Sequence, residues 1–207
     1  MTPLKPTKRH ICDLCGYPQS TCLCAWVAPI SSPLNIIILQ HPKESKHAKN
    51  TVKLLALGIK NITVLQGESP DDWPQLVKNV QSQPQSYCLF YPHEFSHSFE
   101  EVSSFKQKQL RFPINHNVIF IDASWRKALK MWHVNPWLKN CSSWHFSSPP
   151  KNQYQIRATT IPTSLSTLES VAYVLEHTHH VDCSGLHTLF LKMQQKCFID
   201  QNNGLKI

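Results

Sequence analysis

Short apolar segments alternate with amphipathic segments along the chain after Pro33. Residues 34–40 (LNIIILQ), 62–65 (ITVL), 86–91 (SYCLFY) and 118–122 (VIFID) consist mostly of aliphatic and aromatic residues. Strands that are buried on both faces have this composition, because neither face meets water. The four segments are therefore predicted to be strands of a parallel sheet, which is the kind of sheet that helices cover on both sides.

The segments between these strands have the period of a helix. Residues 69–81 begin with acidic residues and residues 164–177 with Ser and Thr, and both features favour a helix N-terminus. Residues 45–59 place four apolar side chains on one helical stripe, namely those of Ala48, Val52, Leu55 and Ile59. The alternation predicts an α/β fold with a parallel sheet, right-handed crossovers and helices on both faces.

Fewer features mark the C-terminal third of the chain. Pro149 and Pro150 predict a loop, and residues 154–157 (YQIR) are expected to form a short strand. Residues 181–207 contain the apolar sequence LHTLFL, which predicts a terminal helix that packs on the domain. We assign that helix no activity.

Four of the eight cysteines lie close together near the N-terminus, in the sequence CDLCGYPQSTCLC. Two cysteine pairs joined by a turn that contains Gly16 and Pro18 offer four thiolates, the ligand set of a closed structural zinc site. An iron–sulfur cluster, redox-active thiols and reduced cysteines without a ligand are the alternatives. We predict a zinc-binding segment over residues 1–30 and an α/β catalytic domain over residues 31–207, with the zinc ligands Cys12, Cys15, Cys22 and Cys24.

The chain is basic, with 21 Lys and Arg against 13 Asp and Glu and a formal net charge of +8. This excess favours a polyanionic partner, although a basic protein without such a partner would have the same composition. No apolar run approaches the roughly 20 residues of a membrane helix. The basic N-terminus MTPLKPTKRH lacks the apolar run of a secretory signal, so we expect a cytoplasmic protein without disulfides.

Polar and ionisable residues follow each predicted strand. The four sequences at these positions are QHPKES, GESPDD, YPHEFS and DASW. Ligands of parallel α/β sheets bind where loops leave the carboxyl ends of the strands, so we expect the functional site there. The sequence contains neither GxGxxG nor GxxxxGK[ST], which disfavours nucleotide binding through either of those loops.

Five motifs in order resemble those of the DTW-domain family. They are the CxxC and CxC pairs, LQHPKE, a Tyr-Pro strand end, DASW, and an Arg and a Pro that precede LSTLE; together they extend over about residues 10–180. The family more often has Thr at the position of Ser124, a conservative difference that keeps the hydroxyl group. The resemblance implies an S-adenosylmethionine-dependent tRNA-uridine aminocarboxypropyltransferase that is related to the knotted methyltransferases of the SPOUT type.

The resemblance also implies a role for Asp122 at the end of the fourth predicted strand. The imide nitrogen of uridine carries a proton and is a poor nucleophile until that proton leaves. The carboxylate of Asp122 is the candidate general base, a role that contributes roughly 10²–10⁴-fold in rate. The alternative is that Asp122 only caps the helix that follows it.

Residues around the strand ends are the candidates for binding S-adenosylmethionine. Free amide groups at a helix N-terminus can hold its carboxylate, although Ser and Thr there can also be simple caps. His41 and Glu44 can likewise be caps, and Trp125 can be a core residue. The candidates that the resemblance implies are His41, Pro42, Glu44, Tyr91, Pro92, Ser124, Trp125, Ser164, Leu165, Ser166 and Thr167.

Basic residues near the same positions are the candidates for contacts with tRNA. Their cations can meet phosphates around the target, and Trp125 can stack on a base. A solvated helix face is the alternative for the lysines and arginine that follow Trp125. The candidates are Lys46, Arg126, Lys127, Lys130 and Arg157.

Two other functions stay open. A sulfonium has three carbons open to attack, and the transferred group depends on which carbon the site holds in line with the nucleophile. An S-adenosylmethionine-dependent RNA methyltransferase is therefore one alternative. A non-catalytic zinc- and RNA-binding module is the other.

Overall fold

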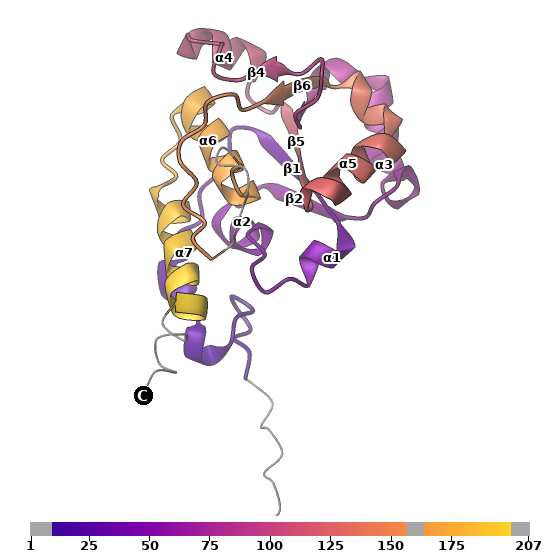
Figure 1. The fold of residues 1–207 in the computed structure, drawn as a ribbon. Coiled ribbons are helices and arrows are strands. Elements are labelled where there is room, and N and C mark those ends of the chain that lie inside the picture. The colour runs from indigo at the N-terminus through magenta and orange to yellow at the C-terminus, as the bar shows by residue number, and fades with distance from the viewer. Residues whose placement is uncertain (1–9, 157–163, 200–207) are drawn as a thin grey trace, which may run out of the picture.

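A six-stranded parallel sheet forms the centre of the protein in the computed structural model, which describes residues 10–156 and 164–199 (Figure 1). The strand order is β2-β1-β5-β3-β6-β4. The strands are β1 (Asn35–Gln40), β2 (Ile62–Gln66), β3 (Tyr87–Phe90), β4 (His97–Ser98), β5 (Asn117–Asp122) and β6 (Ser142–His145). All five strand pairs are parallel, which confirms the predicted α/β fold with a parallel sheet.

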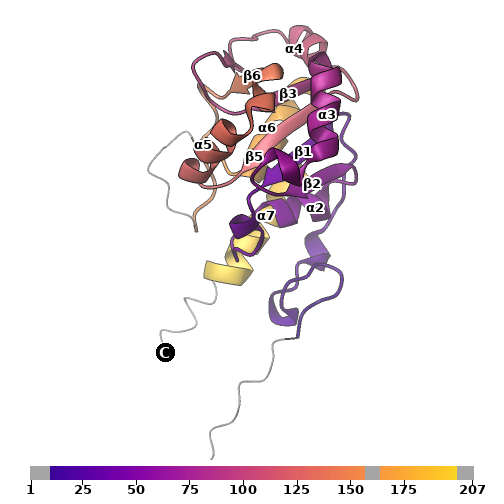
Figure 2. The same ribbon diagram turned by 90° about the vertical axis from the view of Figure 1, so that its right-hand side faces the viewer.

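Helices lie on both sides of this sheet (Figures 1 and 2). On one side Ile36 and Ile38 of β1 belong to a buried cluster with α2, α6 and α7, and on the other side Ile37 and Leu39 belong to a cluster with α3 and α5. Successive residues of a strand point to opposite faces, so an unbroken apolar strand contributes to both clusters. The helices are α1 (Pro42–Ser45), α2 (Val52–Gly58), α3 (Pro74–Ser82), α4 (Phe105–Arg111), α5 (Trp125–Val134), α6 (Thr167–His179) and α7 (Ser184–Gln194).

The four predicted strands are confirmed to within two residues at each end. The predicted terminal helix is also confirmed, since α7 contains the whole LHTLFL sequence. The prediction of one helix over residues 45–59 is wrong in its first half, because α2 begins only at Val52 and Ala48 is exposed. Asn50 accepts a hydrogen bond from the amide of Val52, and His47 accepts one from the amide of Lys49. Such local side-chain bonds replace the helical ladder in this segment.

The predicted helix over residues 69–81 is interrupted. A 3₁₀-helix spans Pro70–Asp72, and α3 begins at Pro74 after Trp73 has left the helical conformation. A proline disfavours the α conformation of the residue before it, which accounts for the break. The predicted short strand at residues 154–157 is wrong for residues 154–156, which form no strand; Arg157 lies outside the described residues.

β4, β6 and α4 were not predicted from the sequence. β6 has the sequence SSWH, which lacks an apolar run, and β4 has only two residues. The described helices include none that is both long and apolar enough to cross a membrane.

The N-terminal segment packs on the α/β domain. Tyr17 and Leu23 are buried in the same cluster as residues of α2 and α7. An antiparallel bridge between Ile11 and Pro18 closes the turn that carries the cysteines, and Gly16 adopts a φ of +66°, which a residue with a side chain seldom adopts.

Candidate active site

A cavity of about 630 Å³ opens at the carboxyl ends of β3, β5 and β6. Its size is typical of small-molecule sites, which occupy roughly 300–1,000 Å³. Its lining combines polar groups, such as Asp122 and Ser166, with aromatic rings, such as Phe120 and Phe146. The cavity lies at the edge of the sheet where the sequence predicts the site.

Asp122 is a buried carboxylate held from two sides. Gln40 pairs with Asp122 in the sheet, and its Nε2 donates to Asp122 Oδ2 at 2.9 Å. Thr167 at the start of α6 donates from its hydroxyl to Asp122 Oδ1 at 2.6 Å. The N-cap of α5 is Ser124, so Asp122 does not cap that helix.

Trp125 begins α5 and lines the cavity. Its side chain is 49% exposed, so it is not a core residue. Ser124, directly before it, also lines the cavity and accepts no capping hydrogen bond through its side chain. Both residues follow β5 immediately, which places them beside Asp122.

The N-terminus of α6 forms another wall, to which Ser164, Leu165, Ser166 and Thr167 contribute. Ser166 and Glu169 form a capping box: the Ser166 hydroxyl accepts from the amide of Glu169, and Glu169 accepts from the amide of Ser166 at 2.8 Å. The other carboxylate oxygen of Glu169 accepts from the amide of Gln153 at 2.6 Å. Glu169 therefore ties the segment after β6 to the start of α6.

Aromatic side chains form the apolar part of the lining. Phe90 of β3 stacks on Phe120 of β5 at a centroid distance of 5.1 Å and on Phe146 at 5.1 Å. Tyr154 also lines the cavity, and its hydroxyl donates to the carbonyl of Lys49. These residues were not predicted as site residues, since an aromatic residue has no local sequence feature that separates a cavity wall from a core position.

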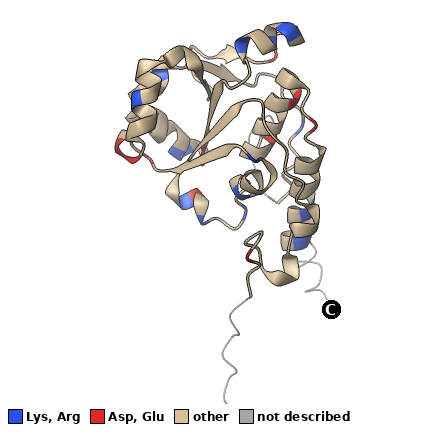
Figure 3. Ribbon diagram, turned by 180° about the vertical axis from the view of Figure 1, so that it is seen from behind, with Lys and Arg blue, Asp and Glu red and all other residues tan. Residues whose placement is uncertain are grey.

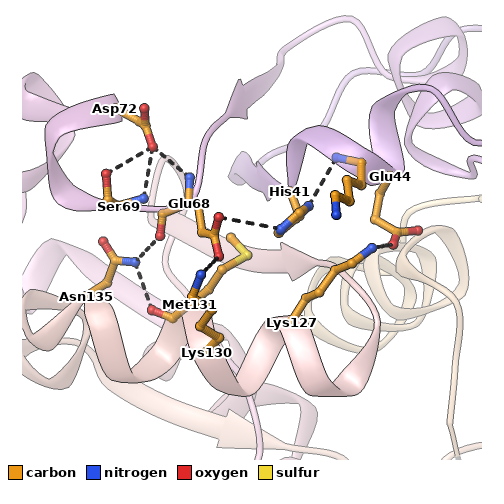
Figure 4. A network of polar contacts seen from close by, with 10 residues as sticks. His41, Glu44, Glu68, Ser69, Asp72, Lys127, Lys130, Met131 and Asn135 are labelled. Carbon is orange, nitrogen blue, oxygen red and sulfur yellow. Dashed lines mark hydrogen bonds and ion pairs between the residues drawn. The ribbon is translucent and has the colours of Figure 1, made fainter.

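His41, Pro42 and Glu44 do not line the cavity, and two of them belong to a polar network beside it (Figure 4). His41 Nε2 lies 3.7 Å from Glu68, which pairs with Lys130 at 2.7 Å. Glu44 pairs with Lys127 at 2.9 Å, so two ion pairs join α5 to the segments after β1 and β2.

His41 is the N-cap of α1, where its Nδ1 accepts from the amide of Lys43 at 3.1 Å. Burial lowers the pKa of His41 below its ordinary value, against the opposing effect of Glu68. The ring is therefore neutral near pH 7. The hydrogen bond from Lys130 lowers the pKa of Glu68, so that carboxyl group is ionised.

The candidate RNA contacts differ in their surroundings. Lys127 and Lys130 are in the ion pairs just described, whereas Arg126 and Lys46 are exposed and in no ion pair among the described residues. Arg157 lies outside the described residues. Figure 3 shows that Lys and Arg occur on several elements of the fold.

The four N-terminal cysteines converge, with all four sulfur atoms within 4.8 Å of one another. Cys12 Sγ lies 3.6 Å from Cys24 Sγ, and Cys15 Sγ lies 3.7 Å from Cys22 Sγ. Four sulfurs about 2.3 Å from one tetrahedral zinc ion are about 3.8 Å apart, so the donor set has the spacing of a zinc site.

The four thiols influence one another's ionisation. Backbone amides of Cys15 and Leu14 lower the pKa of Cys12 to about 6, while hydrogen bonds with Cys22 and Cys12 raise the pKa of Cys24 to about 12. Without a cation the four groups cannot all be charged, and a bound zinc ion would stabilise all four thiolates.

The chain is similar in sequence to proteins named tRNA-uridine aminocarboxypropyltransferases. It is 26% identical over 216 residues to tRNA-uridine aminocarboxypropyltransferase 2 of Macaca fascicularis, an alignment that covers 99% of this chain and 68% of that protein. It is 27% identical over 176 residues to the Drosophila melanogaster protein of that name, over 82% of this chain and 67% of that protein.

A plant relative matches over a shorter region. tRNA-uridine aminocarboxypropyltransferase A of Arabidopsis thaliana is 29% identical over 138 residues, which cover 60% of this chain and 50% of that protein. The chain thus spans between half and about two thirds of the length of these relatives. No solved structure gives a significant match.

The family model described as the DTW domain matches residues 9–198. This range includes the four cysteines, every described strand and the whole lining of the cavity. The resemblance inferred from the motifs is confirmed: the chain belongs to the DTW-domain family.

Proposed function

We propose that this protein transfers the 3-amino-3-carboxypropyl group of S-adenosylmethionine to a uridine in tRNA, forming 3-(3-amino-3-carboxypropyl)uridine. The observation that carries the proposal is the cavity at the strand ends, with the buried carboxylate of Asp122 in its lining. The names of two relatives, whose alignments cover 99% and 82% of this chain, support this activity.

In the proposed reaction Asp122 accepts the proton of the uridine imide nitrogen. The electron pair of that nitrogen forms a bond to the aminocarboxypropyl carbon that is attached to sulfur. The carbon–sulfur bond breaks, its electrons stay on sulfur, and methylthioadenosine leaves. The hydrogen bonds from Gln40 and Thr167 would hold the carboxylate in one orientation for the proton transfer.

The lining offers complementary groups for the parts of S-adenosylmethionine. The aromatic rings of Phe90, Phe120 and Phe146 suit the adenine ring, and aromatic faces also attract a sulfonium cation. The first amides of α6 suit the carboxylate of the amino-acid end. Thr167 is the first residue of α6 and donates a hydrogen bond to Asp122. Binding of the amino-acid end at α6 would therefore place the carbon to be transferred near Asp122.

We propose a structural role for the polar network and for the cysteines. The two ion pairs of the network would hold α5, and with it Trp125, against the cavity. Cys12, Cys15, Cys22 and Cys24 would bind one zinc ion that holds residues 10–30, the described part of the predicted segment 1–30, on the predicted α/β domain 31–207. With no open ligand position, this zinc would take no part in the reaction.

We also propose that the sheet is of the knotted, SPOUT-related kind that the family resemblance implies. The packing of α6 against β5, in the middle of the sheet, is consistent with this proposal. A crystal structure in which the chain can be traced without a break from β6 to α6 would test it.

The proposed activity is tested by incubating the purified protein with S-adenosylmethionine and unmodified tRNA, digesting the tRNA and weighing its nucleosides by mass spectrometry. We expect a uridine that has gained an aminocarboxypropyl group. A gain of a methyl group would instead show an RNA methyltransferase. No change, together with RNA binding, would show a non-catalytic module.

A further inference from the structure

A row of aromatic rings leads from the cavity to the protein surface. Tyr91 lines the cavity and stacks on Trp132 of α5 at a centroid distance of 5.4 Å. Trp132 stacks in turn on His93 at 4.6 Å, and the ring of Phe95 meets His93 edge-on at 6.5 Å. Phe95 is 76% exposed and forms the outer end of the row.

Hydrogen bonds hold the loop that carries Phe95 in one conformation, and the Phe95 ring is exposed in that conformation. Ser96 Oγ accepts from the amide of His93 at 3.0 Å, and the amide of Phe95 donates to His93 Nδ1 at 3.2 Å. Ser96 Oγ also lies 2.9 Å from Nδ1 of His145, a residue of the cavity lining. The loop therefore holds a large exposed apolar ring that ring contacts through His93 and Trp132 connect to Tyr91 of the cavity lining.

The surroundings of the row suit an unpaired base of a nucleic acid. Burial lowers the pKa of His93, so its ring is neutral and stacks without carrying a charge. Lys139 Nζ lies 6.0 Å from the Trp132 ring and can meet a phosphate on that side, whereas Glu94 is exposed in the loop and would repel one. Proteins bind single strands by combining such cations with aromatic rings on which successive bases stack.

We propose that Phe95 stacks on an unpaired base of tRNA that neighbours the uridine in the cavity. This inference rests on the proposed function, because it takes the cavity as the place of the target uridine. A single isolated apolar side chain on a surface needs no explanation. Phe95 differs because its loop is held by hydrogen bonds and because the row of rings joins it to the cavity wall.

The test measures binding of unmodified tRNA, and of a single-stranded oligouridylate, by the wild-type protein and by variants of Phe95. Phe95→Ala is expected to weaken both interactions by roughly 5- to 150-fold, since stacking on one base is worth about 1–3 kcal/mol. The dependence of affinity on salt should stay the same, because no cation is removed. Phe95→Trp should bind as well as the wild type, whereas Phe95→Leu, which is apolar but lacks a π face, should resemble Phe95→Ala.

The matched control is Leu110→Ala, which removes another exposed apolar side chain, 74% exposed, on α4. It should change neither affinity, and the melting temperatures of all variants should equal that of the wild type. Unchanged RNA binding by Phe95→Ala would overturn the inference, as would wild-type affinity in Phe95→Leu. Self-association that Phe95→Ala abolishes without changing RNA binding would show that the ring serves a protein contact instead. Mass analysis of tRNA after reaction with the wild-type protein tests the proposed function separately.

Discussion

The hydroxyl of Thr167 donates a hydrogen bond of 2.6 Å to Oδ1 of Asp122, although the two residues are 45 positions apart. Thr167 is the first residue of α6 and Asp122 the last residue of β5. The same helix end lines the cavity, so one element both shapes the site and orients its carboxylate. Asp122, the proposed base, is therefore hydrogen-bonded to a residue that also lines the proposed site for S-adenosylmethionine.

Replacement of Asp122 by Asn should abolish most of the transfer activity. The amide has nearly the same size but cannot accept the proton, so the rate should fall roughly 10²-fold or more. The fold should persist, because the Thr167 hydroxyl can rotate and accept a hydrogen bond from the NH₂ group of Asn in place of the one that it donates to Asp122. Single-turnover rates and S-adenosylmethionine binding are to be measured. A variant with nearly wild-type rates would show that another group takes the proton.

Replacement of Thr167 by Val should lower the transfer rate about 10-fold or more, while Thr167→Ser should keep it. A hydrogen bond to a charged group is worth about 1.5–3 kcal/mol, and only Val lacks the hydroxyl that makes it. The control is Thr178→Val, which removes a buried hydroxyl of the same helix that donates to the carbonyl of Val174. That control should affect stability alone, as shown by turnover and melting temperature. Equal rates for Thr167→Val and Thr167→Ser would contradict the positioning role.

Protein purified without chelator should contain about one zinc ion per chain by elemental analysis. Cys12→Ser should lose the metal, because three thiolates bind zinc more weakly than four, and its melting temperature should fall. Cys141→Ala changes a buried cysteine of the α/β domain and should leave the zinc content unchanged. Metal-free protein of the same stability would argue against a structural zinc.

Replacement of Arg126 by Gln should reduce the slope of log affinity for tRNA against log salt concentration by about 1, if Arg126 contacts one phosphate. Lys60→Gln, at an exposed position before the amino end of β2, should not change the slope. Lys127 requires a double-mutant cycle with Glu44→Gln, because Lys127→Met also breaks their ion pair. If Lys127 contacts a phosphate, its effect on affinity should persist in the Glu44→Gln background.

Stability should decrease as the pH falls from about 7.5 to 5.5. Burial lowers the pKa values of His41, His93, His116 and His179 below their ordinary value of 6.5. In this range the unfolded chain therefore binds more protons than the folded chain, and folding becomes less favourable with each added proton. Urea unfolding of the zinc-saturated protein should show the decrease, and His116→Phe should make it smaller. Unfolding free energies that do not vary over this range would refute the burial argument.

Local patterns in the sequence were enough for much of this fold. The unbroken apolar runs identified four strands, because a strand between two layers of helices is mostly apolar. The spacing of the cysteines and the DASW motif pointed to the four-cysteine cluster and to Asp122 in the same way, since each depends on residues that are near one another in the chain.

Contacts between distant residues decided the rest. The order β2-β1-β5-β3-β6-β4 depends on which strands pair, and pairing leaves no local mark in the sequence. Phe90, Phe120 and Phe146 became a cavity wall, and Gln40 became a partner of Asp122, only because the parallel register aligns strand ends from separate parts of the chain. Thr167 reaches Asp122 because α6 packs against β5. His41 and Glu44 share the same edge, yet the hydrogen bond of His41 and the ion pair of Glu44 with Lys127 place them in the polar network and away from the cavity. The sequence thus predicts that a residue after a strand lies at the carboxyl edge of the sheet. Which side chains it contacts there depends on how elements that are distant in the sequence pack together.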